Sequence, residues 1–281
     1  MSEQFAEWIG RCEQHVDAMD PWRAQAAAAM LDRNELKLEH GAALPPLWHW
    51  FYFLATLPQS HLGLDGHPQR GGFMPLIELP RRMFAGSRMT FHQPLRLGQP
   101  AERRAQIRDV QQKSGRSGEL AFVTVDYSFE QAGKRCIEEQ QDIVYREAGA
   151  PLPAPQVVAP PAPQAGSWAR EFSADSRLLF RFSALTFNAH RIHYDRAYAH
   201  DEEGYPGLIV HGPLTAMLLA DLVSRNDARR IAAFSFRGAA PLFDLTPLRL
   251  RGTLAGDAVE LEARGPDERV ALSATANLSD Q

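Results

Sequence analysis

Hydrophobic and polar residues alternate over long stretches in the first half of the chain. In the segment 119–131, ELAFVTVDYSFEQ, the residues Val123, Val125, Tyr127 and Phe129 occupy every second position. A period of two is typical of a β-strand with one buried face. Glycine-containing turns at both ends of this segment favour hairpins. We therefore predict a run of antiparallel strands at 88–98, 101–112, 119–131 and 135–147.

The second half of the chain follows a similar plan. The segment 176–187, SRLLFRFSALTF, has a strand-like pattern, and an apolar run from Pro213 to about Ser224 predicts a helix. Four further strands are expected at 230–238, 247–256, 258–266 and 269–280. Residues 88–144 and 231–278 thus share one architecture, which predicts an α+β protein with two layers of helix and antiparallel sheet.

The beginning of the chain has a different period. Between Ser2 and Leu31, apolar residues such as Phe5, Trp8 and Cys12 recur every three or four positions, which predicts helix. The pair Asp20-Pro21 interrupts this stretch, because aspartate can cap a helix and proline suits a first helical turn. The alanine-rich segment after Pro21 is expected to continue as helix.

A proline-rich segment divides the chain. The stretch 150–166, APLPAPQVVAPPAPQAG, contains six prolines, which favour extended chain and remove backbone donors. We predict a first domain at 1–149, a semi-rigid linker at 150–167 and a second domain at 168–281.

Composition narrows the class of protein. The chain has 281 residues, of which 44% are hydrophobic, and a formal net charge of -4, which argues against nucleic-acid binding. No apolar run approaches the roughly 18 residues needed to span a bilayer, and no signal peptide is visible at the N-terminus. The two cysteines, Cys12 and Cys136, are far apart and predict no disulfide framework. A cytoplasmic protein that binds neither nucleic acid nor membrane is expected.

One stretch concentrates residues that can do chemistry. It runs from Thr186 to Leu214, TFNAHRIHYDRAYAHDEEGYPGLIVHGPL. His193 can take a proton from water near neutral pH, and Asn188 can hold a water or carbonyl in place. Gly212 precedes a proline at the expected start of a helix, where unpaired N–H groups can stabilise an anionic oxygen. These groups together suit the addition of water to an enoyl carbonyl system.

Histidines in such a stretch can also bind a metal or pack in the core. His190 and His193 are three positions apart without a clearly placed carboxylate ligand, so no metal site is predicted. His211 fits a packed histidine that bonds a neighbouring carbonyl, and His49, between two tryptophans, fits a core or pocket-wall residue.

The same stretch resembles the signature of MaoC-like, (R)-specific enoyl-CoA hydratases, Gly-Asp-x-Asn-Pro-Leu-His followed by a loop and Leu-His-Gly before a helix. His193 falls on the catalytic histidine of that family, and Asn188 falls where the family has its aspartate. His190 falls on the family's asparagine, and His211-Gly212 on the His-Gly whose glycine N–H receives the thioester oxygen. The resemblance thus implies catalytic roles for His193, Asn188 and Gly212. Because Asn188 replaces a carboxylate, His193 must activate water more on its own.

The altered form of the signature is similar to a narrower branch of that family. The branch comprises mitochondrial-type 3-hydroxyacyl-thioester dehydratases and bacterial hydratases that form citramalyl-CoA from itaconyl-CoA or 3-methylfumaryl-CoA (mesaconyl-CoA). Segments of the first half, among them LPPLWHWFYFL and KSGRSGELAFVTV, resemble the non-catalytic N-terminal domain of the bacterial members. The resemblance implies a double hot-dog fold, in which two curved antiparallel sheets each wrap around a helix.

The resemblance also sets expectations for substrate binding. His190 is expected to orient the substrate, Arg191 or Arg237 to bind its free carboxylate, and Lys113 or Arg116 to meet the phosphates of CoA. No cofactor is expected beyond the CoA of the substrate, and the protein is expected to form a homo-oligomer, a dimer. Three alternatives stay open: a general 3-hydroxyacyl-thioester dehydratase, a hot-dog thioesterase, and a non-enzymatic acyl-CoA-binding protein.

Overall fold

The chain forms two compact units in the computed structural model, which describes residues 3–115, 118–162 and 166–280. Unit 1 contains residues 1–45 and 49–149, and unit 2 contains residues 46–48 and 150–281. The strands and helices of unit 1 are β1 (Cys12–Asp17), α1 (Pro21–Met30), β2 (Arg81–Phe91), β3 (Ala101–Gly115), β4 (Gly118–Gln131) and β5 (Lys134–Arg146), with short 3₁₀ turns at Glu3–Trp8, Trp48–Phe51 and Gln59–His61. Those of unit 2 are β6 (Ser167–Phe172), α2 (Ser176–Leu185), α3 (Gly212–Asn226), β7 (Arg230–Gly238), β8 (Leu248–Ala255), β9 (Ala258–Arg264) and β10 (Val270–Ser279), with short helical turns at Arg191–His193 and Tyr198–Glu202.

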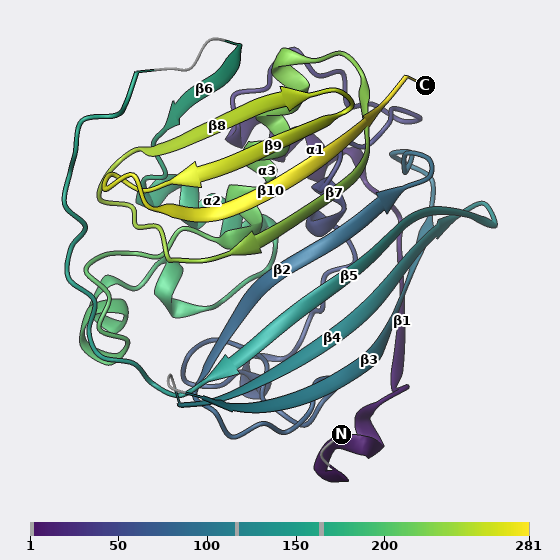
Figure 1. Cartoon of the computed structure of the whole chain (residues 1–281). Helices are drawn as coiled ribbons and strands as arrows, with labels where there is room; N and C mark the ends of the chain where they lie inside the picture. Colours follow the sequence, from purple (N-terminus) through teal and green to yellow (C-terminus); the bar gives the residue numbers. More distant parts are fainter. Residues whose placement is uncertain (1–2, 116–117, 163–165, 281) are drawn as a thin grey trace. The chain divides into compact units, whose positions relative to one another are not determined.

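The sheet of unit 1 is antiparallel throughout, with the strand order β1-β3-β4-β5-β2. Strands β4 and β5 are joined by a tight hairpin at the predicted turn, where Ala132 and Gly133 have φ angles of 51° and 74°. Positive φ at both central residues is the geometry that matches the twist of two adjoining strands. The alternating pattern of β4 therefore predicted both the strand and its connection (Figure 1).

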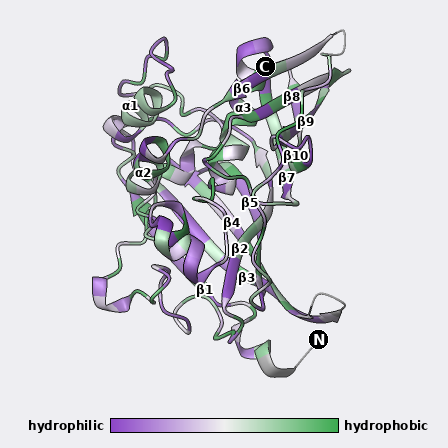
Figure 2. Cartoon of the chain, turned by 90° about the vertical axis from the view of Figure 1, so that its left-hand side faces the viewer, coloured by the Kyte–Doolittle hydropathy of each residue, from purple (hydrophilic) through white to green (hydrophobic). Residues whose placement is uncertain are grey.

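Unit 2 repeats this order with its own five strands, β7-β10-β9-β8-β6. In each unit the first strand in sequence lies at one edge of the five, the second at the other, and the last three form a meander between them. Figure 2 shows hydrophobic and hydrophilic residues mixed along these strands, as expected for sheets with two different faces. The predicted repeat of architecture is confirmed.

Helix α3 covers one face of the unit 2 sheet and contacts all five of its strands. Every residue from Leu214 to Val223 is buried, so the helix forms the centre of this unit. Gly252 of β8 permits the close approach, because a Cβ atom there would lie 3.0 Å from Leu261 Cδ2 and 3.5 Å from Leu222 Cδ2. The prediction of a helix from Pro213 to about Ser224 is confirmed.

In unit 1 a buried carboxylate organises the interior. Glu139 of β5 is 3% exposed and accepts hydrogen bonds from Ser87 Oγ (2.8 Å), Trp50 Nε1 (3.1 Å) and Gln141 Nε2 (2.8 Å). It also lies 3.0 Å from Nε2 of His49, whose ring packs edge-on against Phe129. The expectation that His49 is a core residue is thus confirmed, and its segment is fixed to the sheet by charge as well as by packing.

The strand predicted at 88–98 begins and ends earlier, as β2 (Arg81–Phe91). Two further sequence predictions were wrong. The segment expected to be helical from Ser2 to Asp20 instead forms a 3₁₀ turn and strand β1, because Cys12–Asp17 alternates in burial and pairs with the edge of β3. The segment 176–187, expected as a strand, forms α2, since Asp175 caps its first turn and the buried side chains lie on one helical face. Among the described residues, no helix has the length and apolar character needed to cross a membrane.

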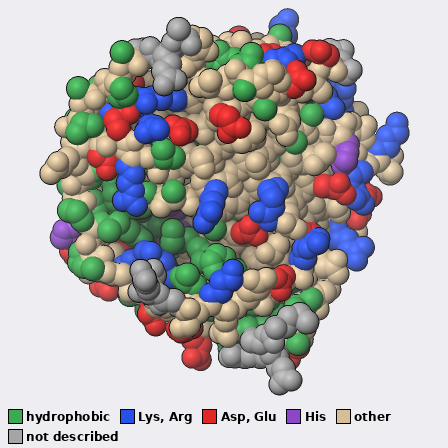
Figure 3. All heavy atoms as spheres, viewed as in Figure 1, with side chains coloured by type: hydrophobic (Ala, Val, Ile, Leu, Met, Phe, Trp, Pro, Cys, Tyr) green, Lys and Arg blue, Asp and Glu red, His purple; other side chains and the backbone are tan. Residues whose placement is uncertain are grey.

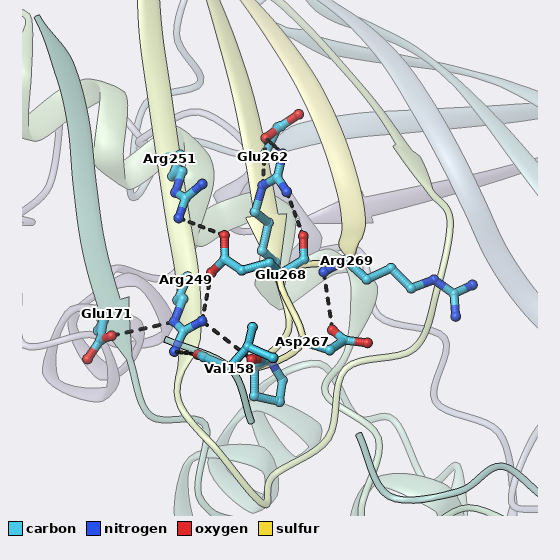
Figure 4. Close-up of polar contacts among 10 residues, drawn as sticks. Val158, Glu171, Arg249, Arg251, Glu262, Asp267, Glu268 and Arg269 are labelled. Atoms are coloured by element: carbon cyan, nitrogen blue, oxygen red, sulfur yellow. Dashed lines mark hydrogen bonds and ion pairs between the residues drawn. The ribbon is translucent and has the colours of Figure 1, made fainter. Parts of the chain in front are cut away.

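The proline-rich segment is held against unit 2. Leu152 N donates to Gly204 O (2.8 Å), and Val158 N donates to Pro266 O (2.9 Å). Arg249 of β8 donates to Val158 O (3.0 Å) while it forms an ion pair with Glu268 (2.6 Å), as Figure 4 shows. The expected linker is therefore tied to the outer face of the β6–β10 sheet by backbone and side-chain hydrogen bonds.

We predict that Gly252→Ala destabilises the protein by about 1–3 kcal/mol, because the added methyl group must displace packed side chains between β8 and α3. Equilibrium urea unfolding measures this. Thr253→Ala is the matched control, since Thr253 is exposed on the opposite face of the same strand, and it is expected to change the free energy of unfolding little. Equal effects of the two variants would contradict the packing role of Gly252.

We also predict that Glu139 makes stability depend on acid pH. Burial raises the pKa of Glu139, but the hydrogen bonds from His49, Gln141 and Ser87 outweigh it, so the pKa lies below the usual value. A carboxyl with a depressed pKa in the folded state contributes stability above its unfolded pKa, and this is lost as pH falls through the folded pKa. Glu139→Gln should cost about 3 kcal/mol at neutral pH and flatten the loss of stability below about pH 4.5.

Urea unfolding at a series of pH values checks this second prediction. Glu119→Gln is the control, because Glu119 is an exposed carboxylate on the neighbouring strand β4. An acid limb that is the same in Glu139→Gln and in the wild type would rule out the proposed linkage.

Candidate functional site

The candidate site begins where α2 ends. Asn188 N donates to Ser183 O (2.8 Å), and the intervening Phe187 has a φ of 50°, so the chain reverses sharply. The side chain of Asn188 then accepts a hydrogen bond from His190 N (3.0 Å). Asparagine favours such a local turn because its short side chain can bond the backbone two residues later. This turn delivers His190 and His193 to the interior, where both are buried.

His193 is fixed by a hydrogen bond to the backbone. Its Nδ1 lies 2.8 Å from Ile209 O, and Ile209 N donates to Ile192 O (3.0 Å), so the two segments are joined side by side. A carbonyl oxygen can only accept, so Nδ1 carries the proton of the neutral ring. The lone pair of neutral His193 is therefore on Nε2, which is the nitrogen that can act as a base.

A second histidine stacks on this ring. The ring centroids of His193 and His211 are 3.6 Å apart, with the planes 19° from parallel. Nε2 of His211 lies 2.9 Å from Ser183 Oγ. Burial, and then the neighbouring His193 and His190, hold the pKa of His211 well below its usual value. His211 is therefore neutral at neutral pH and presents an uncharged aromatic face to His193.

Gly212 follows His211 directly and is the first residue of α3. The first helical hydrogen bond runs from Thr215 N to His211 O (3.0 Å), and Pro213 has no N–H group. Helix geometry thus gives the N–H groups of Gly212 and Leu214 no acceptor within the helix. The His193 ring is stacked on the residue next to Gly212, so the predicted base and the predicted oxyanion donor lie at one helix terminus.

Of the two arginines expected to bind the substrate carboxylate, only Arg191 lies in the same loop as the histidine cluster. Arg191 lies in the loop, but its guanidinium pairs with Asp195 (2.8 Å) and covers the ring of Tyr198, 4.1 Å from the ring centre. Arg237 is exposed on β7, opposite Ser273. Ser273 lines a cavity on the face of the sheet away from α3, so Arg237 does not point toward His193.

The two residues expected near the CoA phosphates belong to unit 1. Lys113 is exposed at the end of β3, with its Nζ 5.1 Å from the centre of the Phe122 ring. Arg116 lies outside the described residues. Their role in binding CoA stays a prediction.

A cavity of about 550 Å³ lies on the outer face of the unit 2 sheet, beneath Pro160 and Pro161. Each of its arginines pairs with a carboxylate: Arg249 with Glu171 and Glu268, Arg251 with Glu268, Arg264 with Glu262, and Arg170 with Asp221. Figure 3 shows acidic and basic side chains intermixed over the view of Figure 1, and Figure 4 shows this network in detail. The network holds the proline-rich segment and has no connection to the histidine cluster in the contacts of the described residues.

Sequence reasoning missed Ser183 and the role of His211. His211 is packed, as expected, but its partner is the Ser183 hydroxyl on α2 and its ring lies against His193. Once Ser176–Leu185 is known to be a helix, Ser183 falls on its buried face beside Phe182. Because the segment was predicted as a strand, the sequence analysis did not place Ser183 on a buried helical face.

Comparison with known proteins identifies the relatives of the chain. The family model of hydroxyacyl-thioester dehydratase type 2 matches residues 47–244. A mesaconyl-C(4)-CoA hydratase from Chloroflexus aurantiacus is 59% identical over 277 residues, which cover 99% of this chain and 99% of the relative. Both matches include the complete stretch from Thr186 to Leu214.

Solved structures support the predicted fold. A MaoC-like dehydratase superposes with a TM-score of 0.73 at 14% identity, over 99% of this chain and 100% of its own. A Mycobacterium tuberculosis protein with a double hot-dog fold superposes with a TM-score of 0.59 at 15% identity, over 96% of each chain. The predicted α+β double hot-dog fold is thus confirmed. From the family match and the full-length relative, the chain belongs to the hydroxyacyl-thioester dehydratase type 2 family and is an enzyme of the hydratase class.

Proposed function

We propose that this enzyme catalyses the reversible addition of water to a short, branched, dicarboxylic enoyl-CoA to form citramalyl-CoA, with 3-methylfumaryl-CoA as the substrate and itaconyl-CoA as a second candidate. The observation that carries the proposal is the fixed Nδ1–H tautomer of His193 beside the N-terminus of α3. The mesaconyl-C(4)-CoA hydratase at 59% identity supports the substrate class.

The mechanism assigns one task to each group. Nε2 of His193 takes a proton from water, and the resulting hydroxide attacks the β-carbon of the enoyl thioester. The electron pair moves to the thioester oxygen, where the Gly212 N–H stabilises the enolate; loss of such a donor costs about 3–4 kcal/mol in acyl transfer. The enolate then collapses and the α-carbon takes the proton from His193, which balances the reaction.

The surrounding residues keep this proton transfer on one ring. His211 has a strongly lowered pKa, so it does not compete with His193 for the proton. Asn188 uses its side-chain oxygen to hold the loop, which leaves its amide N–H groups as the atoms that orient water. His190, whose ring centroid is 5.4 Å from that of His193, is the candidate for orienting the substrate.

Water addition changes no redox state, so the proposed reaction needs no cofactor beyond the CoA of the substrate.

The free carboxylate of the substrate requires a cation, and neither Arg191 nor Arg237 is well placed to supply it. The dimer expected from the resemblance stays a prediction.

A general 3-hydroxyacyl-thioester dehydratase is the second candidate, because the matching family model carries that description. A panel of enoyl-CoA thioesters distinguishes the two. We expect kcat/KM for 3-methylfumaryl-CoA to exceed that for crotonyl-CoA by at least about tenfold, since a missing polar contact to the substrate costs about 1.4 kcal/mol or more. Citramalyl-CoA is quantified directly by mass spectrometry. Equal turnover of both thioesters would favour the general dehydratase, and release of CoA thiol would indicate a thioesterase.

We further expect His193→Gln to lower kcat by about 10²- to 10⁴-fold, because glutamine can hydrogen-bond but cannot take a proton. Loss of absorbance of the conjugated thioester measures the rate. His200→Gln is the control, since His200 is an exposed histidine nearby in the same loop and pairs with Asp201. Undiminished turnover by His193→Gln would place the base elsewhere and support a different site.

A further inference from the structure

Unit 1 contains two arginines that converge on one aromatic ring. Arg82 of β2 stands directly opposite Tyr145 of β5, and its guanidinium carbon lies 6.0 Å from the centre of that ring. Arg70, from the loop before β2, lies 5.7 Å from the same ring centre. Tyr145 is 1% exposed and belongs to a buried apolar cluster with Ile77 and Ile143. Both guanidinium groups therefore lie beside buried apolar side chains.

Within the described part of the chain, neither Arg70 nor Arg82 forms an ion pair with a carboxylate. Arg70 is held by two backbone carbonyls, those of Ile77 and Pro80 (3.1 Å for the latter), and makes no ion pair in the described part of the chain. Arg82 is half-buried, and within residues 3–115, 118–162 and 166–280 it makes neither an ion pair nor a side-chain hydrogen bond. By contrast, Arg88, on the same strand as Arg82, pairs with Asp142 (2.8 Å).

The charges of Arg70 and Arg82 both affect the pKa of the neighbouring His67. Burial lowers the pKa of His67, and the positive charges of Arg82 and Arg70 lower it further, against the opposing effect of Asp65. Asp65 itself lies 3.1 Å from Nδ1 of His67. The Asp65 carboxylate therefore contacts His67, and both guanidinium groups lie close enough to His67 to lower its pKa.

We propose that Arg70 and Arg82 form an oxyanion-binding site in unit 1, which takes a carboxylate or phosphate group. A guanidinium fork matches either group in a bidentate manner, and the Tyr145 ring and the two carbonyls on Arg70 hold the forks in place before binding. The identity of the anion rests on the proposed function, because the thioester proposed above carries both a free carboxylate and the phosphates of CoA.

The test uses Arg82→Ala in the full-length protein, because the Arg82 side chain makes no hydrogen bond to another described residue whose loss would unfold the chain. We expect KM for 3-methylfumaryl-CoA to rise about tenfold with kcat nearly unchanged, and Arg82→Lys to give a smaller rise because it keeps the charge and loses the fork. Arg11→Ala is the matched control, since Arg11 also lies over an aromatic ring of unit 1, that of Trp8 at 4.6 Å. Its KM should stay within about twofold of the wild type.

Three substrates distinguish the two sources of the anion. If the site binds the carboxylate, Arg82→Ala raises KM for 3-methylfumaryl-CoA and for the N-acetylcysteamine thioester of 3-methylfumarate, and leaves crotonyl-CoA unaffected. If it binds a phosphate of CoA, KM rises for both CoA thioesters and not for the N-acetylcysteamine thioester. A KM in Arg82→Ala that matches the Arg11→Ala control for all three substrates would overturn the site. Arg82→Gln replaces Arg82→Ala in this comparison if the melting temperature shows that the alanine variant is unfolded.

Failure of the proposed function is distinguishable from failure of the site. If the wild type adds no water to any of the thioesters, the hydratase proposal is wrong. Calorimetric titration with CoA and with 3-methylfumarate still tests the site. Weaker binding of either probe to Arg82→Ala than to Arg11→Ala supports an oxyanion site, and equal or undetectable binding to both variants and the wild type rejects it.

Discussion

The hydrogen bond from His193 Nδ1 to Ile209 O is the interaction on which the chemistry of unit 2 depends. It assigns the tautomer, since the carbonyl can only accept, and it sets the direction in which Nε2 points. The same peptide segment returns a hydrogen bond from Ile209 N to Ile192 O, so ring and backbone are fixed together. Three residues later the chain becomes α3, so the bond also sets the position of the base relative to the helix N-terminus.

The histidine cluster favours proton exchange at His193, because the ring stacked on it, His211, is a poor proton acceptor. Burial dominates the lowered pKa of His211, and any charge on His193 lowers it further. A neutral ring at 3.6 Å can stack on His193 in either protonation state, whereas a second imidazolium there would repel it. The hydroxyl of Ser183 orients His211 from α2, so the end of one helix supports the beginning of the next through two side chains.

The two units share one strand order and use it differently. Unit 2 buries ten consecutive residues of α3, and its histidine cluster lies where that helix begins. Unit 1 instead buries Glu139 with His49 as its polar centre, and its half-buried arginines Arg70 and Arg82 lie beside the buried ring of Tyr145. A repeated sheet therefore carries acid–base groups in one unit and, as we propose, oxyanion recognition in the other, which fits the rule that function belongs to sites and not to folds.

Local periodicity in the sequence was sufficient for β3–β5 and β7–β10, because buried and exposed positions alternate over most of these strands, and the apolar residues of α3 were sufficient for that helix. Residue types in the stretch 186–214 made His193 and Gly212 candidates, since an ionisable ring and a glycine before a helical proline are visible in the sequence, and their catalytic roles stay predictions. Periodicity failed for β1 and α2, because these elements are too short to separate the two periods, so that pairing with β3 and the Asp175 cap decided the outcome. The stacking of His211, the outward direction of Arg237 and the convergence of Arg70 and Arg82 on Tyr145 join residues far apart in sequence or depend on strand register. Only the tertiary structure determined them, because register and long-range packing set which side chains meet.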